Sequence, residues 1–382
     1  MGGIYKNPAI TIVAASAEVV SEGFLDSTAL EPTAKLPMFI NDSTTAIVYL
    51  RSSRQRDESS EDEPSFRRAW TPQEFLLSPR SLVFTSTQIV FHCRQFKFQS
   101  ILKTYLDCEF QTGGTLPASI FGLVDDNESP LEGRETERGC LGEKELQLRK
   151  SLVECYSSKS LTNPEDCLPA LAGIAAELSI SWGGALYLAG FWENIIVEQL
   201  GWRRKDRIAE ITGVDSPKRI GAPSWSWVSV PFAVDIKTLS RRDARLLGSS
   251  VQLLSEQSPF GQIREASITI EARIIKAGDS KVALSFSCIL MGRVGLDENS
   301  MALDFGERVP DRNKCALLYL GERDQNSIFL VMGRNENEQS QRVGTATLDI
   351  RKRGWGFFDP KNNKREWEEY LNSVPRKTIT IW

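Results

Sequence analysis

Six short segments in the last part of the chain constrain its fold more than any other feature of the sequence. Each segment is rich in β-branched or aromatic residues and is bounded by Gly, Asn, Asp or charged residues, which is the pattern of strands joined by turns. They cover residues 267–276, 282–291, 314–320, 327–332, 344–350 and 377–382. Only residues 364–372 show helical periodicity in this part. We therefore expect an antiparallel, β-rich region over residues 220–382.

Helical signals precede this region. Apolar residues recur at spacings of three and four in residues 144–157, 166–178 and 186–201, which predicts core helices within a helical region over residues 146–215. Residues 101–145 are predicted to be a variable loop, because Gly, Pro, Asp and Glu dominate from Gly113 to Gly142.

Residues 224–230 alternate Ser and Trp with a period of two, which predicts a strand with Trp225 and Trp227 on one face. Burial in the core explains these two side chains better than a platform for a ligand.

The first hundred residues alternate between strand and helix signals. A buried strand is expected at residues 9–15 and a hairpin over residues 81–85 and 88–93, whereas the acidic residues 57–64 predict an exposed loop. Residues 1–100, 101–145, 146–215 and 220–382 thus form four expected regions. The predicted fold class is mixed α+β.

Residues 67–80 combine a tryptophan, an amide and a carboxylate in one predicted short helix. Thr71 is a good N-cap with Glu74 at the capping-box position, Pro72 fits the first turn, and Ser78-Pro79 ends the helix. A functional interpretation competes with this one. Glu74 is a candidate catalytic carboxylate, because a helix-borne carboxylate beside an indole could stabilise a cation or accept a ribose hydroxyl.

Three neighbours of Glu74 complete this candidate site. Trp70, Gln73 and Arg80 are the candidate ligand-binding residues. On physical grounds alone, Trp70 is better explained as a core residue and Arg80 as the partner of a carboxylate or carbonyl group.

Other common chemistries have little support. His92 is the only histidine, which excludes a metal site built from several histidines, and we predict no metal and no cofactor. The chain contains no phosphate-binding loop, no nucleophile elbow and no dinucleotide fingerprint. His92 and Cys93 are adjacent in a predicted strand, so they point to opposite faces and cannot easily act together. We expect a partly buried histidine at a strand end.

Composition limits the partners and the compartment. The formal net charge of -4 predicts no nucleic-acid partner. Seven scattered cysteines without a Cys-x-x-Cys pair indicate reduced thiols in a cytoplasmic protein, and nothing at the start is typical of a signal peptide. The most apolar window, residues 170–191, is interrupted by Glu177, Gly183 and Gly184 and predicts buried helices instead of a membrane span.

Four groups of residues resemble one known family. The Arg-x-Trp-Thr-x-Gln-Glu pattern of residues 67–80 resembles the hallmark of the fungal heterokaryon incompatibility (HET) domain family, and residues 3–15 resemble its Gly-x-Ile-Tyr-x-Asn block. Residues 88–93 are similar to its closing strand, with Phe91 and His92 where Trp and Glu are usual. Residues 222–230 resemble the Ala-Pro-Ser-Trp-Ser-Trp block of these fungal proteins. The family's first two blocks are absent, so residues 1–100 are expected to be the later part of a HET domain truncated at its N-terminus.

The resemblance implies a function in fungal non-self recognition and programmed cell death. One hypothesis is an effector that signals through assembly with protein partners. The alternative follows a remote similarity of the HET domain to TIR domains, some of which cleave NAD, and it would make Glu74 the functional carboxylate. A third possibility is an inactive truncated remnant. The sequence leaves enzymatic activity undecided.

Overall fold

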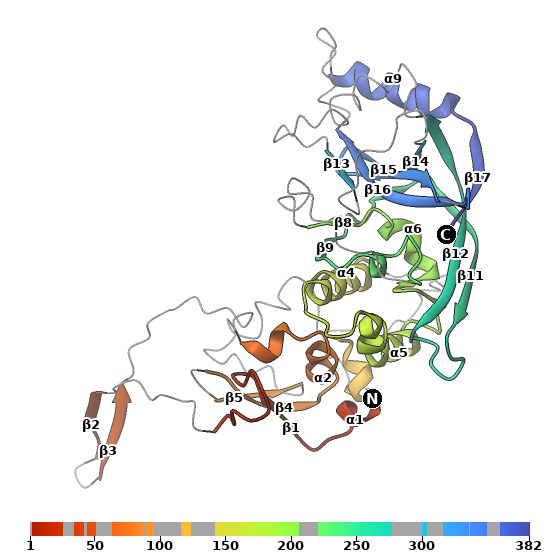
Figure 1. Cartoon of the computed structure of the whole chain (residues 1–382). Helices are drawn as coiled ribbons and strands as arrows, with labels where there is room; N and C mark the ends of the chain where they lie inside the picture. Colours follow the sequence, from red (N-terminus) through yellow and green to blue (C-terminus); the bar gives the residue numbers. More distant parts are fainter. Residues whose placement is uncertain are drawn as a thin grey trace. The chain divides into compact units, whose positions relative to one another are not determined.

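The computed structural model divides the chain into two compact units, Met1–Val124 and Asp125–Trp382, each described separately below (Figure 1). Both contain helices and strands, which confirms the mixed α+β class. The described residues are 2–25, 34–41, 44–50, 63–86, 89–94, 116–123, 142–205, 221–276, 300–303, 316–335, 337–349 and 360–382.

The first unit is built around a three-stranded sheet. β1 (Thr11–Ala14) runs parallel to β4 (Arg80–Phe84), which pairs antiparallel with β5 (Ile89–Cys93). The predicted strands at residues 9–15, 81–85 and 88–93 are therefore confirmed, with bounds that differ by one or two residues. The other elements are α1 (Gly2–Lys6), the β2–β3 hairpin (Ala34–Asn41 and Thr44–Leu50), η2 (Pro64–Arg67), α2 (Thr71–Leu76) and η3 (Ala118–Phe121).

One face of this sheet covers the core of the first unit. Val83 and Val90 pack there with Phe66, Phe75 and Ala15. The acidic segment expected as an exposed loop meets this core at its end. Residues 57–62 lie outside the described residues, but Glu63 is buried, and its Oε1 accepts hydrogen bonds from the Ser86 backbone N–H and hydroxyl, both at 2.8 Å. The prediction of exposure was therefore wrong for Glu63, because local hydrogen bonds compensate its burial.

The second unit begins with helices. α4 (Glu143–Ser157) confirms the helix predicted at residues 144–157, whereas the helix predicted at 166–178 starts as the 3-10 turns η4 (Pro164–Cys167) and η5 (Pro169–Leu171) before α5 (Ala172–Ser181).

The helix predicted at residues 186–201 is wrong in its first half. A hairpin of β6 (Tyr187–Leu188) and β7 (Phe191–Trp192) occupies this stretch, followed by η6 (Glu193–Ile195) and α6 (Ile196–Gln199). Ala189 and Gly190 have φ values of 45° and 95°, which turn the chain out of any helix.

The strand predicted at residues 224–230 is also wrong. The segment forms turns and η7 (Trp227–Ser229), because the Ser226 hydroxyl accepts a hydrogen bond from the Val228 N–H at 3.1 Å and donates one to the Ala189 carbonyl at 2.6 Å. Such local bonds compete with strand pairing. The predicted burial is confirmed, since Trp225 and Trp227 are 0% and 1% exposed.

A large antiparallel sheet completes the second unit, in the order β11-β12-β14-β15-β16-β13, with β17 and β10 pairing with β12 and β14. Its strands are β10 (Arg241–Arg242), β11 (Arg245–Leu253), β12 (Ile263–Lys276), β13 (Ser300–Leu303), β14 (Ala316–Arg323), β15 (Asn326–Arg334), β16 (Ser340–Asp349) and β17 (Arg376–Ile381). A separate short pair joins β8 (Arg203–Arg204) to β9 (Val234–Asp235).

Five of the six strands predicted in this part are confirmed, whereas residues 282–291 lie outside the described residues. β11 was not predicted.

The last residues of the chain contact two strands of this sheet. β17 pairs with β12, and the Trp382 N–H donates to the Ser340 carbonyl of β16 at 3.1 Å. The helix α9 (Pro360–Ser373), predicted at residues 364–372, inserts Trp367 into the core against Phe329, and the Trp367 Nε1–H donates to Ser327 Oγ at 2.9 Å. The sheet therefore curls around an apolar core that α9 covers.

Candidate functional site

The helix α2 begins differently from the predicted capping box. Thr71 is its first residue, and its hydroxyl donates to the Ser65 carbonyl at 2.5 Å instead of capping the helix. Glu74 is likewise free of a capping role, because its Oε1 accepts a hydrogen bond from the Tyr5 hydroxyl at 3.1 Å. The helix ends at Leu76, before Pro79, as predicted. The carboxylate of Glu74 is thus bound by a residue 69 positions earlier in the chain.

Tyr5 fixes one oxygen of this carboxylate. Its side chain comes from α1, which packs against α2. Burial, followed by the charge and the hydrogen bond of Glu74, raises the pKa of the Tyr5 hydroxyl, whereas Arg68 opposes this shift. Tyr5 therefore stays protonated and acts as a donor. A half-buried carboxylate held at one oxygen keeps the other oxygen available for a second partner.

The remaining candidate residues differ in their exposure. Trp70 is half-buried immediately before α2, with its carbonyl accepting from the Gln73 and Glu74 N–H groups at 3.2 and 3.3 Å. Gln73 is fully buried. Arg80 is exposed on β4, and its Nη1 lies 3.5 Å from the Ala9 carbonyl. The structure therefore brings Trp70 and Glu74 to one helix start, with Tyr5 as the partner that the sequence did not indicate.

His92 has the position predicted for it. It is half-buried on β5, its ring centroid lies 5.2 Å from that of Phe75, and its Nδ1 makes no hydrogen bond with the described residues. Burial, assisted by the nearby charge of Arg94, lowers the pKa of His92 from 6.5 to about 4. The imidazole is therefore neutral at physiological pH.

The second face of the β1–β4–β5 sheet is exposed and apolar. The register aligns Ile12 with Leu82 and Phe91 in one row and Phe84 with Ile89 in the next. Ile12 is 59% exposed, Phe91 56% and Ile89 52%. We call this surface the outer face. The expectation that residues 9–15 form a buried strand is correct only for the opposite face, because alternate residues of a strand point in opposite directions.

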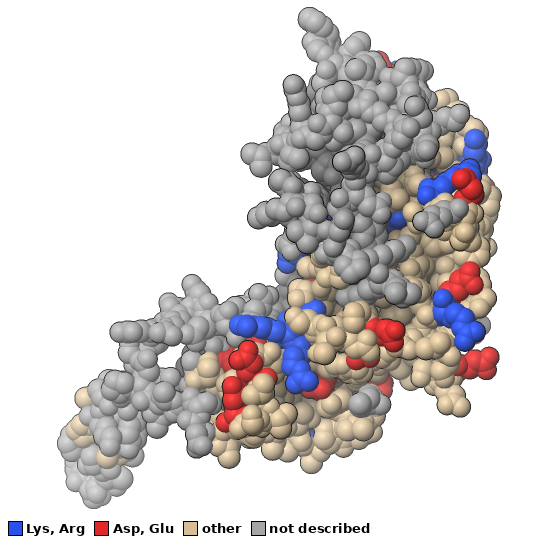
Figure 2. Space-filling model, viewed as in Figure 1, with Lys and Arg blue, Asp and Glu red and all other residues tan. Residues whose placement is uncertain are grey.

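Charged side chains do not gather by sign on the surface shown in Figure 2. Among the described residues on that face, basic and acidic side chains lie beside one another. No described helix is both long and apolar enough to cross a membrane. Within the same residues, no group of three or more His, Cys, Asp or Glu side chains could hold a metal ion.

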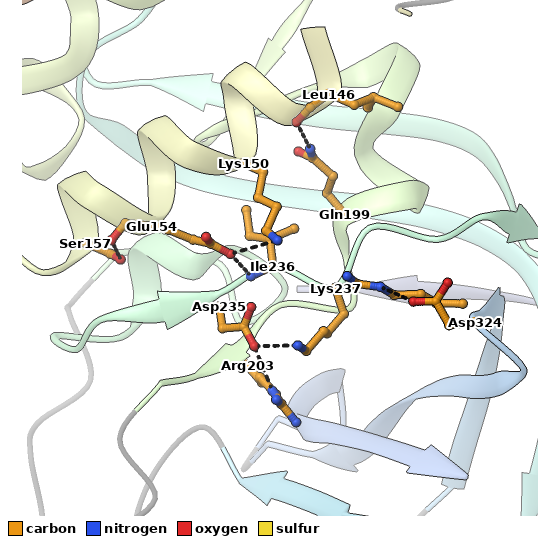
Figure 3. A network of polar contacts seen from close by, with 11 residues as sticks. Leu146, Lys150, Glu154, Ser157, Gln199, Arg203, Asp235, Ile236, Lys237 and Asp324 are labelled. Atoms are coloured by element: carbon orange, nitrogen blue, oxygen red, sulfur yellow. Dashed lines mark hydrogen bonds and ion pairs between the residues drawn. The ribbon is translucent and has the colours of Figure 1, made fainter. Parts of the chain in front are cut away.

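A network of charged residues joins α4 to the β8–β9 pair in the second unit (Figure 3). Asp235 Oδ2 accepts from Lys237 Nζ at 2.9 Å and from Arg203 Nε at 3.2 Å. Glu154 Oε1 accepts from the Ile236 N–H at 2.8 Å and lies 3.8 Å from Lys150 Nζ. Burial raises the pKa of Glu154; for Asp235, burial is outweighed by Lys237 and Arg203, which lower its pKa. Both carboxylates are held by protein donors, so the network stabilises this junction.

Comparison with known proteins identifies the first segment. The family model described as "Heterokaryon incompatibility protein (HET)" matches residues 1–74. No curated protein and no solved structure matches the chain. The matched segment begins with the α1 region that carries Tyr5 and ends at Glu74, so the Tyr5–Glu74 hydrogen bond joins its two ends. Residues 1–74 are therefore similar to the HET family, and the match covers about a fifth of the 382-residue chain.

Proposed function

We propose that this chain is a cytoplasmic effector of fungal non-self recognition and programmed cell death, which signals by assembling with protein partners. The family match at residues 1–74 supports a heterokaryon incompatibility function. On the face shown in Figure 2, basic and acidic side chains of the described residues lie beside one another, a mixture that fits a protein partner.

The outer face of the β1–β4–β5 sheet is the observation that carries this proposal. β1 and β4 are parallel, and parallel sheets are usually covered on both faces. Here one face holds the core, while Ile12, Ile89 and Phe91 are each more than half exposed on the other. A contiguous patch of exposed apolar side chains often marks an interaction site. A protein partner would bury these side chains.

A charge placed on the outer face tests the proposal. Phe91→Lys places a cation on the surface that a partner would bury, and burying an unpaired charge is costly. Because the Phe91 side chain is 56% exposed, the substitution should have little effect on the fold. Leu254→Lys is the matched control, because Leu254 is 54% exposed but lies outside the outer face. Chemical cross-linking of the full-length chain in fungal cells should show assemblies for the wild type and for Leu254→Lys. Their loss is expected only in Phe91→Lys, and equal cross-linking of all three proteins would refute the proposal.

A second candidate function is NAD cleavage, which the Tyr5–Glu74 hydrogen bond favours. The hydrogen bond fixes one oxygen of the Glu74 carboxylate in the first turns of the helix that follows the half-buried Trp70, and these two side chains could bind a ribose and the planar nicotinamide. Water would replace nicotinamide on the ribose carbon, releasing nicotinamide, ADP-ribose and a proton. Glu74 would stabilise the positive charge that develops on the ribose ring.

Cellular NAD separates the two functions. If the chain cleaves NAD, its expression lowers NAD, Glu74→Gln abolishes the loss, and Tyr5→Phe slows it without changing the fold. Cell death with unchanged NAD would exclude cleavage and leave assembly as the function.

A further inference from the structure

A solvent-open cavity of about 610 Å³ lies at the surface of the second unit, where η6 and α6 meet the corner between β10 and β11. Its walls also include Arg376, the first residue of β17. Sites for small molecules generally measure about 300–1,000 Å³. Its lining includes neither Tyr5, Glu74 nor any other predicted functional residue.

Most of the charged side chains that line this cavity are paired with one another. Arg242 Nη1 donates to Glu198 Oε1 at 3.0 Å, which uses one of its five N–H donors. Asp243 is shared by two guanidinium groups, those of Arg376 at 2.8 Å and Arg273 at 3.3 Å. The lining itself carries three guanidinium groups, those of Arg242, Arg245 and Arg376, and three carboxylates, those of Glu193, Glu198 and Asp243.

Arg245 is the residue best placed to receive a ligand. It is exposed at the rim of the cavity, and its guanidinium group makes no hydrogen bond or ion pair with the described residues. Guanidinium groups match phosphate and carboxylate geometry with two parallel hydrogen bonds. Arg245 therefore offers its full donor set to an anion, and Arg242 offers the donors that Glu198 does not use.

The opposite side of the cavity provides an acceptor and open space. Glu193 Oε1 accepts from the Ser249 hydroxyl at 3.0 Å, which leaves its other oxygen available to a hydroxyl group. The register of β11 shifts between Leu246 and Gly248, so Leu247 lies in a β-bulge, a feature that often re-aims side chains near functional sites. A Cβ atom added to Gly248 would meet no atom within 4 Å. The wall is thus open where a ligand would lie.

We propose that this cavity binds a small hydroxylated organic anion, such as a sugar phosphate or a sugar acid. Arg245 and Arg242 bind its phosphate or carboxylate group. Glu193 accepts a hydrogen bond from one of its hydroxyl groups, and Val197 and Leu246 contact its carbon skeleton.

Isothermal titration calorimetry of the full-length chain tests this proposal with three probes. Ribose 5-phosphate and gluconate carry the two anionic groups, and neutral ribose carries neither. Binding of at least one anion is expected, with no binding of ribose. The two anionic probes show which group the arginines prefer. Binding of ribose as tight as that of the anions, or no binding of any probe, would overturn the proposal.

Two variants locate the bound anion. Arg245→Gln should weaken binding at least about tenfold, because it removes one charge-assisted hydrogen bond to the anion. Gly248→Phe should abolish binding by filling the cavity. The melting temperature of this variant should equal that of the wild type, which would show that the fold is intact. Arg264→Gln is the control, since Arg264 is an exposed arginine of β12 that does not line the cavity. Wild-type affinity in both Arg245→Gln and Gly248→Phe would refute the site.

Discussion

Replacing His92 with glutamine removes the only imidazole in the chain and should make the protein more resistant to mild acid. His92 lies half-buried against Phe75, and burial together with Arg94 lowers its pKa from 6.5 to about 4. The folded state therefore disfavours the protonated ring. The stability that His92 contributes is fully present above pH 6.5 and is lost as the pH falls from 6.5 towards about 4.

The size of this effect follows from the two pKa values. At pH 5 the unfolded chain binds nearly one proton at His92 and the folded chain binds almost none. The resulting loss of unfolding free energy is about 2 kcal/mol relative to pH 8, as an upper value because the ring is partly exposed. Glutamine cannot titrate, so His92→Gln should lose about 2 kcal/mol less than the wild type over this range.

Two measurements test the prediction. Because the chain has a single histidine, its ring protons give one set of NMR signals whose titration reports the pKa directly. Urea unfolding at pH 8, 6.5 and 5 then compares the wild type with His92→Gln. A ring pKa near 6.5, or parallel loss of stability in the two proteins, would refute the assignment of a neutral, desolvated imidazole.

Three other substitutions test the packing and electrostatics of the second unit. Gly190→Ala should cost about 2 kcal/mol in urea unfolding, because φ is 95° and the new Cβ would lie 2.8 Å from Trp227 Nε1; an unaltered midpoint would contradict this geometry. Trp367→Ala should cost about 3–5 kcal/mol and lower the melting temperature, since the indole is fully buried under α9; Glu366→Ala, on the same helix, is the control. Asp235→Asn should destabilise at pH 7 by about 1 kcal/mol or less. Lys237 and Arg203 lower the pKa of Asp235 despite its burial, so its stabilisation is present above the unfolded pKa and lost as the pH falls through the folded one; an equal effect at pH 2 and pH 7 would argue against the ion pairs.

Strands rich in β-branched residues could be predicted from the sequence, whereas segments whose conformation depends on contacts with distant residues could not. β12, β14, β15, β16 and β17 carry a strong local signal because each packs apolar side chains against the sheet core. β11 was missed because Gly248, Ser249 and Ser250 interrupt its apolar pattern, and only pairing with β12 makes it a strand. The spacing of apolar residues in 186–201 is helical, but the positive φ values at Ala189 and Gly190 override it.

The candidate site shows the same division. Glu74 and Trp70 could be identified from one contiguous motif, and His92 from its place at a strand end. Tyr5 could not be linked to Glu74, because 69 residues separate them and only the packing of α1 on α2 brings them together. The cavity at Arg245 draws its walls from residues between Glu193 and Arg376, so no local pattern could indicate it.

Viability of fungal cells after induced expression tests the proposed effector function most directly. Four forms of the full-length chain are compared: wild type, Phe91→Lys, Leu254→Lys and Glu74→Gln. If the outer face drives assembly and death, the wild type, Leu254→Lys and Glu74→Gln kill cells, whereas cells that express Phe91→Lys at the same level survive. Equal killing by Phe91→Lys and the wild type would contradict a role for the outer face. Survival with Glu74→Gln alone would instead assign the death signal to the carboxylate.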